Sequence, residues 1–225
     1  MMMNQAVDKG DEGRGIPGRL PALLIVTSIL AYVAFFSWLS IVLHNRFWTA
    51  GYDLGNFDQA IWNTLHGRIL RLTNLEGFHS RLGLHVEPIL ILLSPVYLIW
   101  SDPRALLLIQ TVALAAGAIP ICRLAKERLG RWPALGFVIV YLLFPALEGA
   151  NTHQFHANTL AVPFLAAAFY AVERRWYRAL AVWAALAMVC REEIALVVGM
   201  LGLYMVLTQR ETRGWWLVGG GTAVF

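Results

Sequence analysis

The chain has 225 residues, of which 58% are hydrophobic and only 14% are charged, whereas soluble domains average roughly 45 to 50% apolar and about 25% charged residues. The charges gather in short clusters between long apolar runs, which excludes an ordinary soluble enzyme and indicates an integral membrane protein. The net charge of +4 is modest and does not indicate nucleic-acid binding. The two cysteines, Cys122 and Cys190, lie in apolar stretches and suggest neither a disulfide framework nor a thiolate metal site.

The N-terminal part of the chain changes sharply in character near residue 20. Residues 1–19 are polar and glycine-rich, which predicts a disordered cytoplasmic tail. Residues 20–43 carry no charge and exceed the roughly 20 residues that span a bilayer, so they predict an uncleaved anchor helix. Residues 45–104 mix polar and aromatic side chains over a length too great for a simple turn. They predict a large first loop outside the membrane.

Further apolar runs follow this loop. They cover residues 105–122, 132–147, 157–172, 179–190, 194–208 and 214–225. The connections at 123–131, 173–178 and 209–213 are rich in Lys and Arg and are therefore predicted to be cytoplasmic. Residues 20–225 thus predict an all-α, polytopic domain in the cytoplasmic (inner) membrane, with the N-terminus inside. Because the last run stops within a crossing, we expect the chain to be truncated at the C-terminus.

Residues 89–100 are apolar but too few to span a bilayer, and they contain Pro95. We interpret them as a helix lying at the outer interface, ending before Asp102. A second interfacial helix is predicted within residues 51–68, because apolar residues recur there at helical spacing, namely Leu54, Phe57, Ile61 and Leu65. Asp53 would lie just before this helix and Asp58 one turn inside it. The alternative is that Asp53 only caps the helix and Asp58 faces solvent.

Two further polar motifs lie on the predicted outer face. In HVEP, Pro88 keeps Glu87 out of a regular helix and leaves His85 and Glu87 on one side of an extended segment. Such a pair can bind a metal or a sugar hydroxyl, or it is an ordinary surface feature. The turn at residues 148–159 carries Glu148, Asn151, His153 and His156 between two apolar runs. Polar residues so near bilayer depth usually face a cavity, although a simple interfacial position is the alternative.

The two histidines of this turn are three residues apart and could share one helix face. The zinc-protease pattern HExxH is absent from the sequence, so zinc hydrolysis is not indicated.

The motif CREEIA interrupts an otherwise uncharged stretch, residues 179–208, with Arg191, Glu192 and Glu193. Three ionisable groups at the centre of one buried helix would cost on the order of 2.5 to 3.5 kcal/mol each. A broken helical hairpin with the three residues at its outer tip avoids this cost. Arg191 would then be a fixed cation suited to a phosphate, unless it only pairs with a neighbouring Glu to order the hairpin.

The strings YDLGNFDQAIWNTLHG, HVEPILILLSPVY, FPALEGANTHQFHANTLAVP and CREEIALVVGMLGLY resemble the prokaryotic family of predicted membrane proteins called domain-of-unknown-function family 2079, over residues 52–225. The layout of that family resembles the GT-C superfamily of integral-membrane glycosyltransferases. The resemblance implies a GT-C-like helical bundle with interfacial helices in its first outer loop. It also implies that Asp58 or Asp53 is the active-site acid of that loop.

The resemblance further matches Glu87 to a Glu that opens the interfacial helix, His156 to an acid at the second outer turn, and Arg191 to a basic residue in a broken hairpin. The sequence departs from the superfamily by carrying histidines at the second turn and Arg rather than Lys in the hairpin. A divalent metal such as Mg or Mn, held by Glu87 and His156 with Asp58, is therefore a conditional expectation.

The activity implied by the resemblance is transfer of a sugar from a polyprenyl-phosphate donor to an acceptor at the outer face of the membrane. Asp58 would be the general base, with Asp53 in reserve, and Arg191 would stabilise the departing lipid phosphate. His85, Glu192 and His153 would bind substrate. The expected partners are the lipid-linked donor and membrane lipids, and no nucleic acid.

Two alternatives remain open. One is a transporter or flippase, in which Arg191, Glu192 and Glu193 form a charge relay within the membrane. The other is a non-catalytic membrane scaffold whose outer loop binds a partner.

Overall fold

The computed structural model describes residues 19–49, 51–73, 77 and 79–224. Every regular element in this part of the chain is a helix, and the strand-like pairing there is limited to an isolated bridge between Arg71 and Ser80. The prediction of an all-α protein is therefore confirmed. The polar tail expected at residues 1–19 lies outside the described residues, except for Arg19, which opens the first helix.

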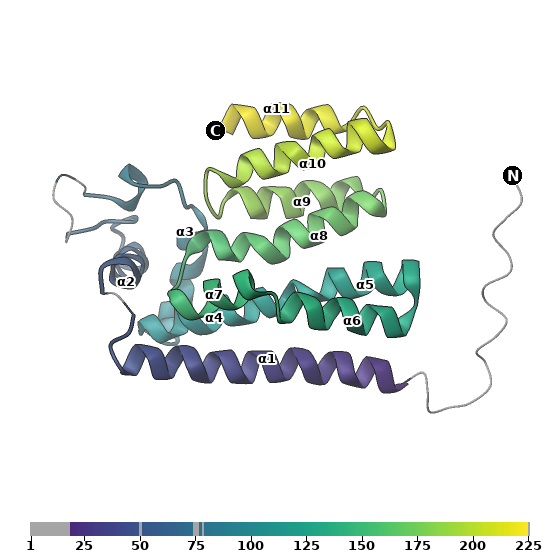
Figure 1. Cartoon of the computed structure of the whole chain (residues 1–225). Helices are drawn as coiled ribbons and strands as arrows, with labels where there is room; N and C mark the ends of the chain where they lie inside the picture. The colour runs from purple at the N-terminus through teal and green to yellow at the C-terminus, as the bar shows by residue number, and fades with distance from the viewer. Residues whose placement is uncertain (1–18, 50, 74–76, 78, 225) are drawn as a thin grey trace, which may run out of the picture.

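The first helix, α1 (Arg19–Asn45), confirms the predicted anchor. Its 27 residues give a length of about 40 Å, enough to cross a bilayer. Only four of its residues are buried, because one stripe packs on the rest of the protein; three of them are Tyr32, Phe36 and Ser40. The helix lies along one side of the bundle (Figure 1). Its outward apolar surface is what a lipid-facing helix requires.

The second long apolar segment is formed by α4 (Pro103–Ala116) and α5 (Ala118–Leu129), which follow each other directly. The connection expected at residues 123–131 is therefore mostly helical, and this boundary was predicted wrongly. Its Arg, Lys, Glu and Leu residues are strong helix formers, so charge alone does not end the helix. The chain turns only at Gly130, whose φ of 95° favours glycine.

The next pair, α6 (Arg131–Leu142) and α7 (Pro145–His153), is bent by 43°. Phe144 is extended and Pro145 starts the new helix, as expected of a residue before proline and of proline in a first helical turn. The polar turn expected at residues 148–156 is thus largely helix α7, followed by an extended segment. If the bent pair is one span, three described segments are long and apolar enough to cross a membrane: α1, α4 with α5, and α6 with α7.

The remaining helices are each shorter than 18 residues, and they stack side by side (Figure 1). They are η3 (Ala157–Leu160), α8 (Ala161–Glu173), α9 (Tyr177–Met188), α10 (Ile194–Gln209) and α11 (Gly214–Val224). Arg175 and Arg210 turn the chain with positive φ angles of 55° and 54°. The break between α9 and α10 falls at residues 189–193, so the predicted hairpin with Arg191 at its tip is confirmed.

The segment 45–104 contains α2 (Gly51–Leu65), η1 (Arg81–Gly83), α3 (Ile89–Leu93) and η2 (Ser94–Leu98). It lies at the same end of the bundle as the α9–α10 turn, whereas the arginine-rich turns lie at the opposite end (Figure 1). The largest apolar core joins this segment to α4, η3 and the hairpin, through residues such as Phe57, Leu90, Leu106, Phe155 and Cys190. The segment 45–104 is therefore packed onto the helices.

Candidate functional site

The helix α2 presents its predicted apolar stripe to the core, where Leu54, Phe57 and Ile61 are buried. The helix begins at Gly51, so Asp53 lies within its first turn. The prediction that Asp53 lies just before the helix is wrong. The ring of Phe57 meets Phe155 edge to face, with centroids 5.1 Å apart. This contact fixes α2 against the segment that follows α7.

A buried ion pair lies beside this ring. Arg81 Nε donates to Glu87 Oε2 at 2.7 Å, and the two side chains are 8% and 1% exposed. The guanidinium of Arg81 also lies over the Phe57 ring, 3.9 Å from its centroid, as a cation packs on an aromatic face. The other carboxylate oxygen of Glu87, Oε1, is buried without a hydrogen-bond partner among the described residues.

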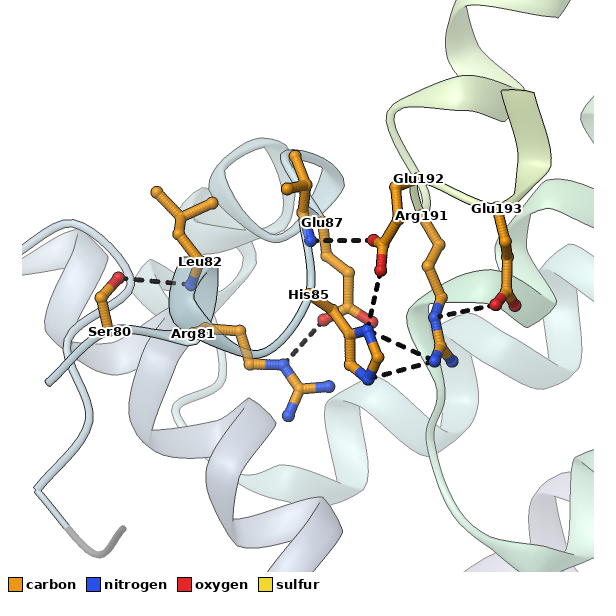
Figure 2. A network of polar contacts seen from close by, with 9 residues as sticks. Ser80, Arg81, Leu82, His85, Glu87, Arg191, Glu192 and Glu193 are labelled. Carbon is orange, nitrogen blue, oxygen red and sulfur yellow. Dashed lines mark hydrogen bonds and ion pairs between the residues drawn. The ribbon is translucent and has the colours of Figure 1, made fainter. Parts of the chain in front are cut away.

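His85 points the other way, toward the hairpin tip (Figure 2). Its Nδ1 lies 2.8 Å from Glu192 Oε1, and its Nε2 lies 3.1 Å from Arg191 Nη2. Arg191 Nη2 is also 3.4 Å from Nδ1, so it lies almost equally near both ring nitrogens. Because the carboxylate of Glu192 only accepts, its contact places a proton on Nδ1. His85 and Glu87 thus lie close in the chain but use different partners.

The hairpin tip is tied to the HVEP segment by its backbone as well. The amide of Val86 donates to Glu192 Oε2 at 2.9 Å, and the amide of Ile89 donates to the carbonyl of Val189 at 2.8 Å. Burial opposes ionisation of Glu192, but the hydrogen bonds from His85 and Val86 outweigh it and lower the pKa of the carboxyl. Glu192 therefore remains an anion that orients His85.

Arg191 is the least satisfied group of this cluster. Its Nε is buried without a hydrogen bond, and the nearest carboxylate oxygen, on Glu193, is 3.6 Å away. Two of the three buried polar side-chain atoms without a partner in the described part of the chain, Arg191 Nε and Glu87 Oε1, belong to this cluster. One is a donor and the other an acceptor, and buried groups of both kinds normally have partners. The cluster thus holds one buried donor and one buried acceptor without partners among the described residues.

The second polar turn is organised by Gln110 of α4, which is fully buried. Its Oε1 accepts from the amide of His156 at 2.9 Å, and its Nε2 donates to the carbonyl of Gln154 at 2.8 Å. His153 ends α7 and His156 is extended, so the two do not share a helix face. Their ring centroids are 6.1 Å apart, and that of His156 is 6.2 Å from Phe57. The second turn therefore reaches the ion-pair cluster through Phe57.

Asp58 belongs to a different group of contacts. Its Oδ1 accepts from the hydroxyl of Tyr97 at 2.6 Å. Burial raises the pKa of Asp58 above its usual value and the negative charge of Asp102 adds to this effect, while Tyr97 and His44 oppose it. The structure therefore brings His85, Glu87, Arg191 and Glu192 into one cluster. Asp58 lies outside this group: it follows Phe57 on α2 and its partner is Tyr97.

The expected metal site is not formed. Within the described residues, no group of three or more His, Cys, Asp or Glu side chains could hold a metal ion. Glu87 instead pairs with Arg81, and Asp58 with Tyr97. The residues present therefore do not fit a divalent metal held by Asp58, Glu87 and His156.

Two of these partners were missed by the sequence interpretation. Arg81 had no signal beyond its charge, because its role depends on Glu87 and Phe57 folding around it. Gln110 did have a signal, since it is a polar residue inside an uncharged run of α4. A buried polar side chain in such a run needs partners, and here these partners are the backbone groups of the second turn.

The composition, the membrane-length helices and the polar cluster at one end of the bundle define a helical integral membrane protein. The chain belongs to the family described as "Predicted membrane protein (DUF2079)", which it matches over residues 43–225. The match includes α2, the HVEP segment, the second turn and the hairpin tip. No curated protein and no solved structure matches the chain.

Proposed function

We propose that the protein transfers a sugar from a polyprenyl-phosphate donor to an acceptor at the outer face of the cytoplasmic membrane. The observation that carries the proposal is the buried Nε of Arg191, a donor without a hydrogen bond. It lies at a hairpin tip that the HVEP segment holds in place. A phosphate group supplies the acceptors and the negative charge that such a guanidinium binds best.

Arg191 forms an ion pair with Glu193 at 3.6 Å, as the alternative interpretation expected, but this distance is too long for a hydrogen bond and its Nε keeps a free donor within the described residues. Glu192 is occupied by His85 and Val86. The positive charge of Arg191 is therefore only partly balanced by its neighbours. Besides binding the donor, Arg191 would stabilise the transition state. The negative charge on the phosphate grows as its bond to the sugar breaks, and a fixed cation stabilises the transition state more than the bound donor.

Glu87 supports the binding of the sugar. Its Oε2 is held by Arg81, so Oε1 keeps a fixed direction in which it would accept a hydrogen bond from a sugar hydroxyl. Carboxylates fixed in this way are common in the recognition of hydroxyl groups because they need no reorganisation on binding. His153, which is exposed at the end of α7, and His156 would line the same region from the second turn.

Asp58 is the proposed general base. Tyr97 uses Oδ1, which leaves Oδ2 for the acceptor hydroxyl. As that oxygen bonds to the anomeric carbon, its proton passes to Asp58 and the bond from the anomeric carbon to the phosphate oxygen breaks, leaving its electron pair on the phosphate. A raised pKa suits a base that must hold this proton. Asp53, in the preceding turn of α2, is the reserve candidate.

The test is sugar transfer from a radiolabelled polyprenyl-phosphate sugar in membranes containing the full-length protein. We expect Arg191→Ala to lower turnover by about 10² to 10³ and Asp58→Asn by about 10² to 10⁴. Arg213→Ala is the matched control, because Arg213 is 62% exposed at the other end of the bundle. Equal turnover in all variants at equal protein levels would contradict the proposal and favour transport or scaffolding.

A further inference from the structure

The end of the bundle opposite the polar cluster is strongly basic. Residues 123–131, 173–178 and 209–213 form this basic end, at the turns α5–α6, α8–α9 and α10–α11 (Figure 1). The three segments contain nine Arg and Lys residues and three Glu residues, which gives the basic end a net charge of +6. The whole chain has a net charge of only +4, so the positive charge is concentrated here.

Glu173 joins the turns of the basic end. Its Oε2 accepts from Arg128 of α5 at 2.9 Å, and its Oε1 accepts from Tyr204 and Gln209 of α10 at 2.8 Å and 3.1 Å. Because Glu173 is itself the last residue of α8, one carboxylate connects three helices. The turns therefore form one continuous surface.

The other two carboxylates of the basic end are engaged in the same way. Each accepts from a tyrosine hydroxyl, at 2.7 Å for Glu127 and 2.8 Å for Glu211, and each pairs with an arginine, at 3.6 Å and 3.9 Å. The tyrosines are Tyr170 and Tyr177, and the arginines are Arg174 and Arg213. All three acidic residues of the basic end are thus bound by the protein itself.

Five basic side chains of this surface form no ion pair within the described residues. All five are exposed: Arg123, Lys126, Arg175, Arg178 and Arg210. Like charges held on one surface repel one another, and a ligand that brings negative charge relieves this repulsion. The basic end is therefore complementary to an anion.

The depth of the basic end in the membrane identifies the anion. The apolar segment α4–α5 ends there at Leu129, and the bent pair α6–α7 begins there at Arg131. Trp132, Trp176 and Trp216 lie beside the three turns and are 55%, 48% and 84% exposed. Tryptophan is enriched where membrane spans meet the lipid headgroups. The basic end therefore lies at headgroup depth, where lipid phosphates are the anions within its reach.

We propose that the basic end binds the headgroups of anionic phospholipids such as phosphatidylglycerol, through the five basic side chains that form no ion pair. Arginine suits this role because its guanidinium binds two phosphate oxygens at once. A zwitterionic headgroup is disfavoured, because the net positive charge repels its ammonium group. The proposal is independent of sugar transfer, since the α9–α10 turn with Arg191 lies at the opposite end of the bundle (Figure 1).

The test variant removes one charge from each segment of the basic end or its adjoining helix. It carries Arg123→Gln, Arg178→Gln and Arg210→Gln together. These side chains are exposed and form no ion pair in the described part of the chain, so the fold should be kept, as circular dichroism can verify.

The matched control removes the same number of charges from the other end. It carries Arg46→Gln, Arg68→Gln and Arg71→Gln, at exposed positions within the segment 45–104. Both triple variants have the same net charge, so a difference between them reports position alone. A second control, Arg191→Ala, removes the cation that is proposed to bind the donor phosphate.

The measurement is the lipid retained by the purified full-length protein after equilibration with equimolar phosphatidylglycerol and phosphatidylcholine, read by native mass spectrometry. Each basic residue near an anionic surface contributes roughly fivefold to binding at low salt. We therefore expect the wild type and both controls to retain phosphatidylglycerol about tenfold or more over phosphatidylcholine. The test variant should retain the two lipids about equally, and added salt should weaken the preference of the wild type.

The proposal is wrong if the wild type retains both lipids equally or if the test variant keeps the preference. It is also wrong if either control loses the preference, because net charge or the site at Arg191 would then account for lipid binding. Displacement of the lipid by inorganic phosphate at the same concentration would contradict it as well, since the surface would then bind free phosphate rather than a headgroup.

Discussion

The buried ion pair of Arg81 and Glu87 stabilises the segment 45–104, and its removal gives a prediction of definite size. The two side chains are 8% and 1% exposed, and their charged atoms are 2.7 Å apart. In Arg81→Met the apolar stem remains but Glu87 is left buried without a cation. Breaking a buried pair in this way costs about 3 to 5 kcal/mol. We expect the free energy of unfolding to fall by this amount.

The double variant Arg81→Met with Glu87→Leu separates charge from packing. Replacing both partners of a buried pair by apolar residues is often neutral, so most of the lost stability should return. For a chain of this size 1 kcal/mol corresponds to about 2 to 4 °C, so the single variant should unfold roughly 6 to 20 °C earlier. Thermal unfolding in detergent, followed by tryptophan fluorescence, measures both variants.

The control is Arg104→Met, since its pair with Asp102 is 37% and 22% exposed. Exposed pairs contribute about 0 to 1 kcal/mol, so this variant should unfold within a few degrees of the wild type. If Arg81→Met behaves like the control, or if the double variant loses as much as the single one, the buried charge is not what holds the segment.

Three further predictions concern single side chains. Because burial raises the pKa of Asp58 above 3.8, its ionised form destabilises the folded protein at neutral pH. Asp58→Asn should therefore raise the unfolding temperature at pH 7, and this gain should disappear as the pH falls toward 3.8. For Glu192, hydrogen bonds lower the pKa below 4.5. Its contribution to stability is therefore present above pH 4.5 and is lost as the pH falls through the pKa of the folded protein. Glu192→Gln should unfold at a slightly lower temperature than the wild type at neutral pH and at the same temperature in acid. A Cβ on Gly202 would lie 2.5 Å from the carbonyl oxygen of Gly214, so Gly202→Ala should lower the free energy of unfolding by about 1 to 3 kcal/mol. At Gly220 a Cβ meets no atom within 4 Å, so Gly220→Ala should leave stability unchanged. Thermal unfolding of the two variants in parallel measures the difference.

Much of the fold followed from local patterns in the sequence. The uncharged run of α1 and the helical spacing of Leu54, Phe57 and Ile61 report burial directly, because periodicity reflects which face is covered. The position of Arg191 at a hairpin tip followed from the cost of burying three ionisable groups. These inferences needed no knowledge of distant parts of the chain.

The contacts that build the site could not be read in the same way. His85 and Glu192 are 107 residues apart in sequence, and no local period records their pairing. Residues 148–153, the second part of α7, were interpreted as the start of a turn because their polar side chains suggested a connection. Proline at its first turn and the contact of Asn151 with α1 favour the helix instead. Local polarity was outweighed by packing, as happens often in short helices.

The tie between the HVEP segment and the hairpin also sets an order of assembly during synthesis. The ribosome adds about 5 to 20 residues per second, so the 107 residues between His85 and Glu192 take roughly 5 to 20 s. During this interval His85 and the amides of Val86 and Ile89 lack their final partners. Arg81 and Glu87, which pair with each other, have both been synthesised by then. The hairpin tip thus completes the contacts of the HVEP segment, and a nascent chain stopped before residue 189 lacks the partners of Val86 and Ile89.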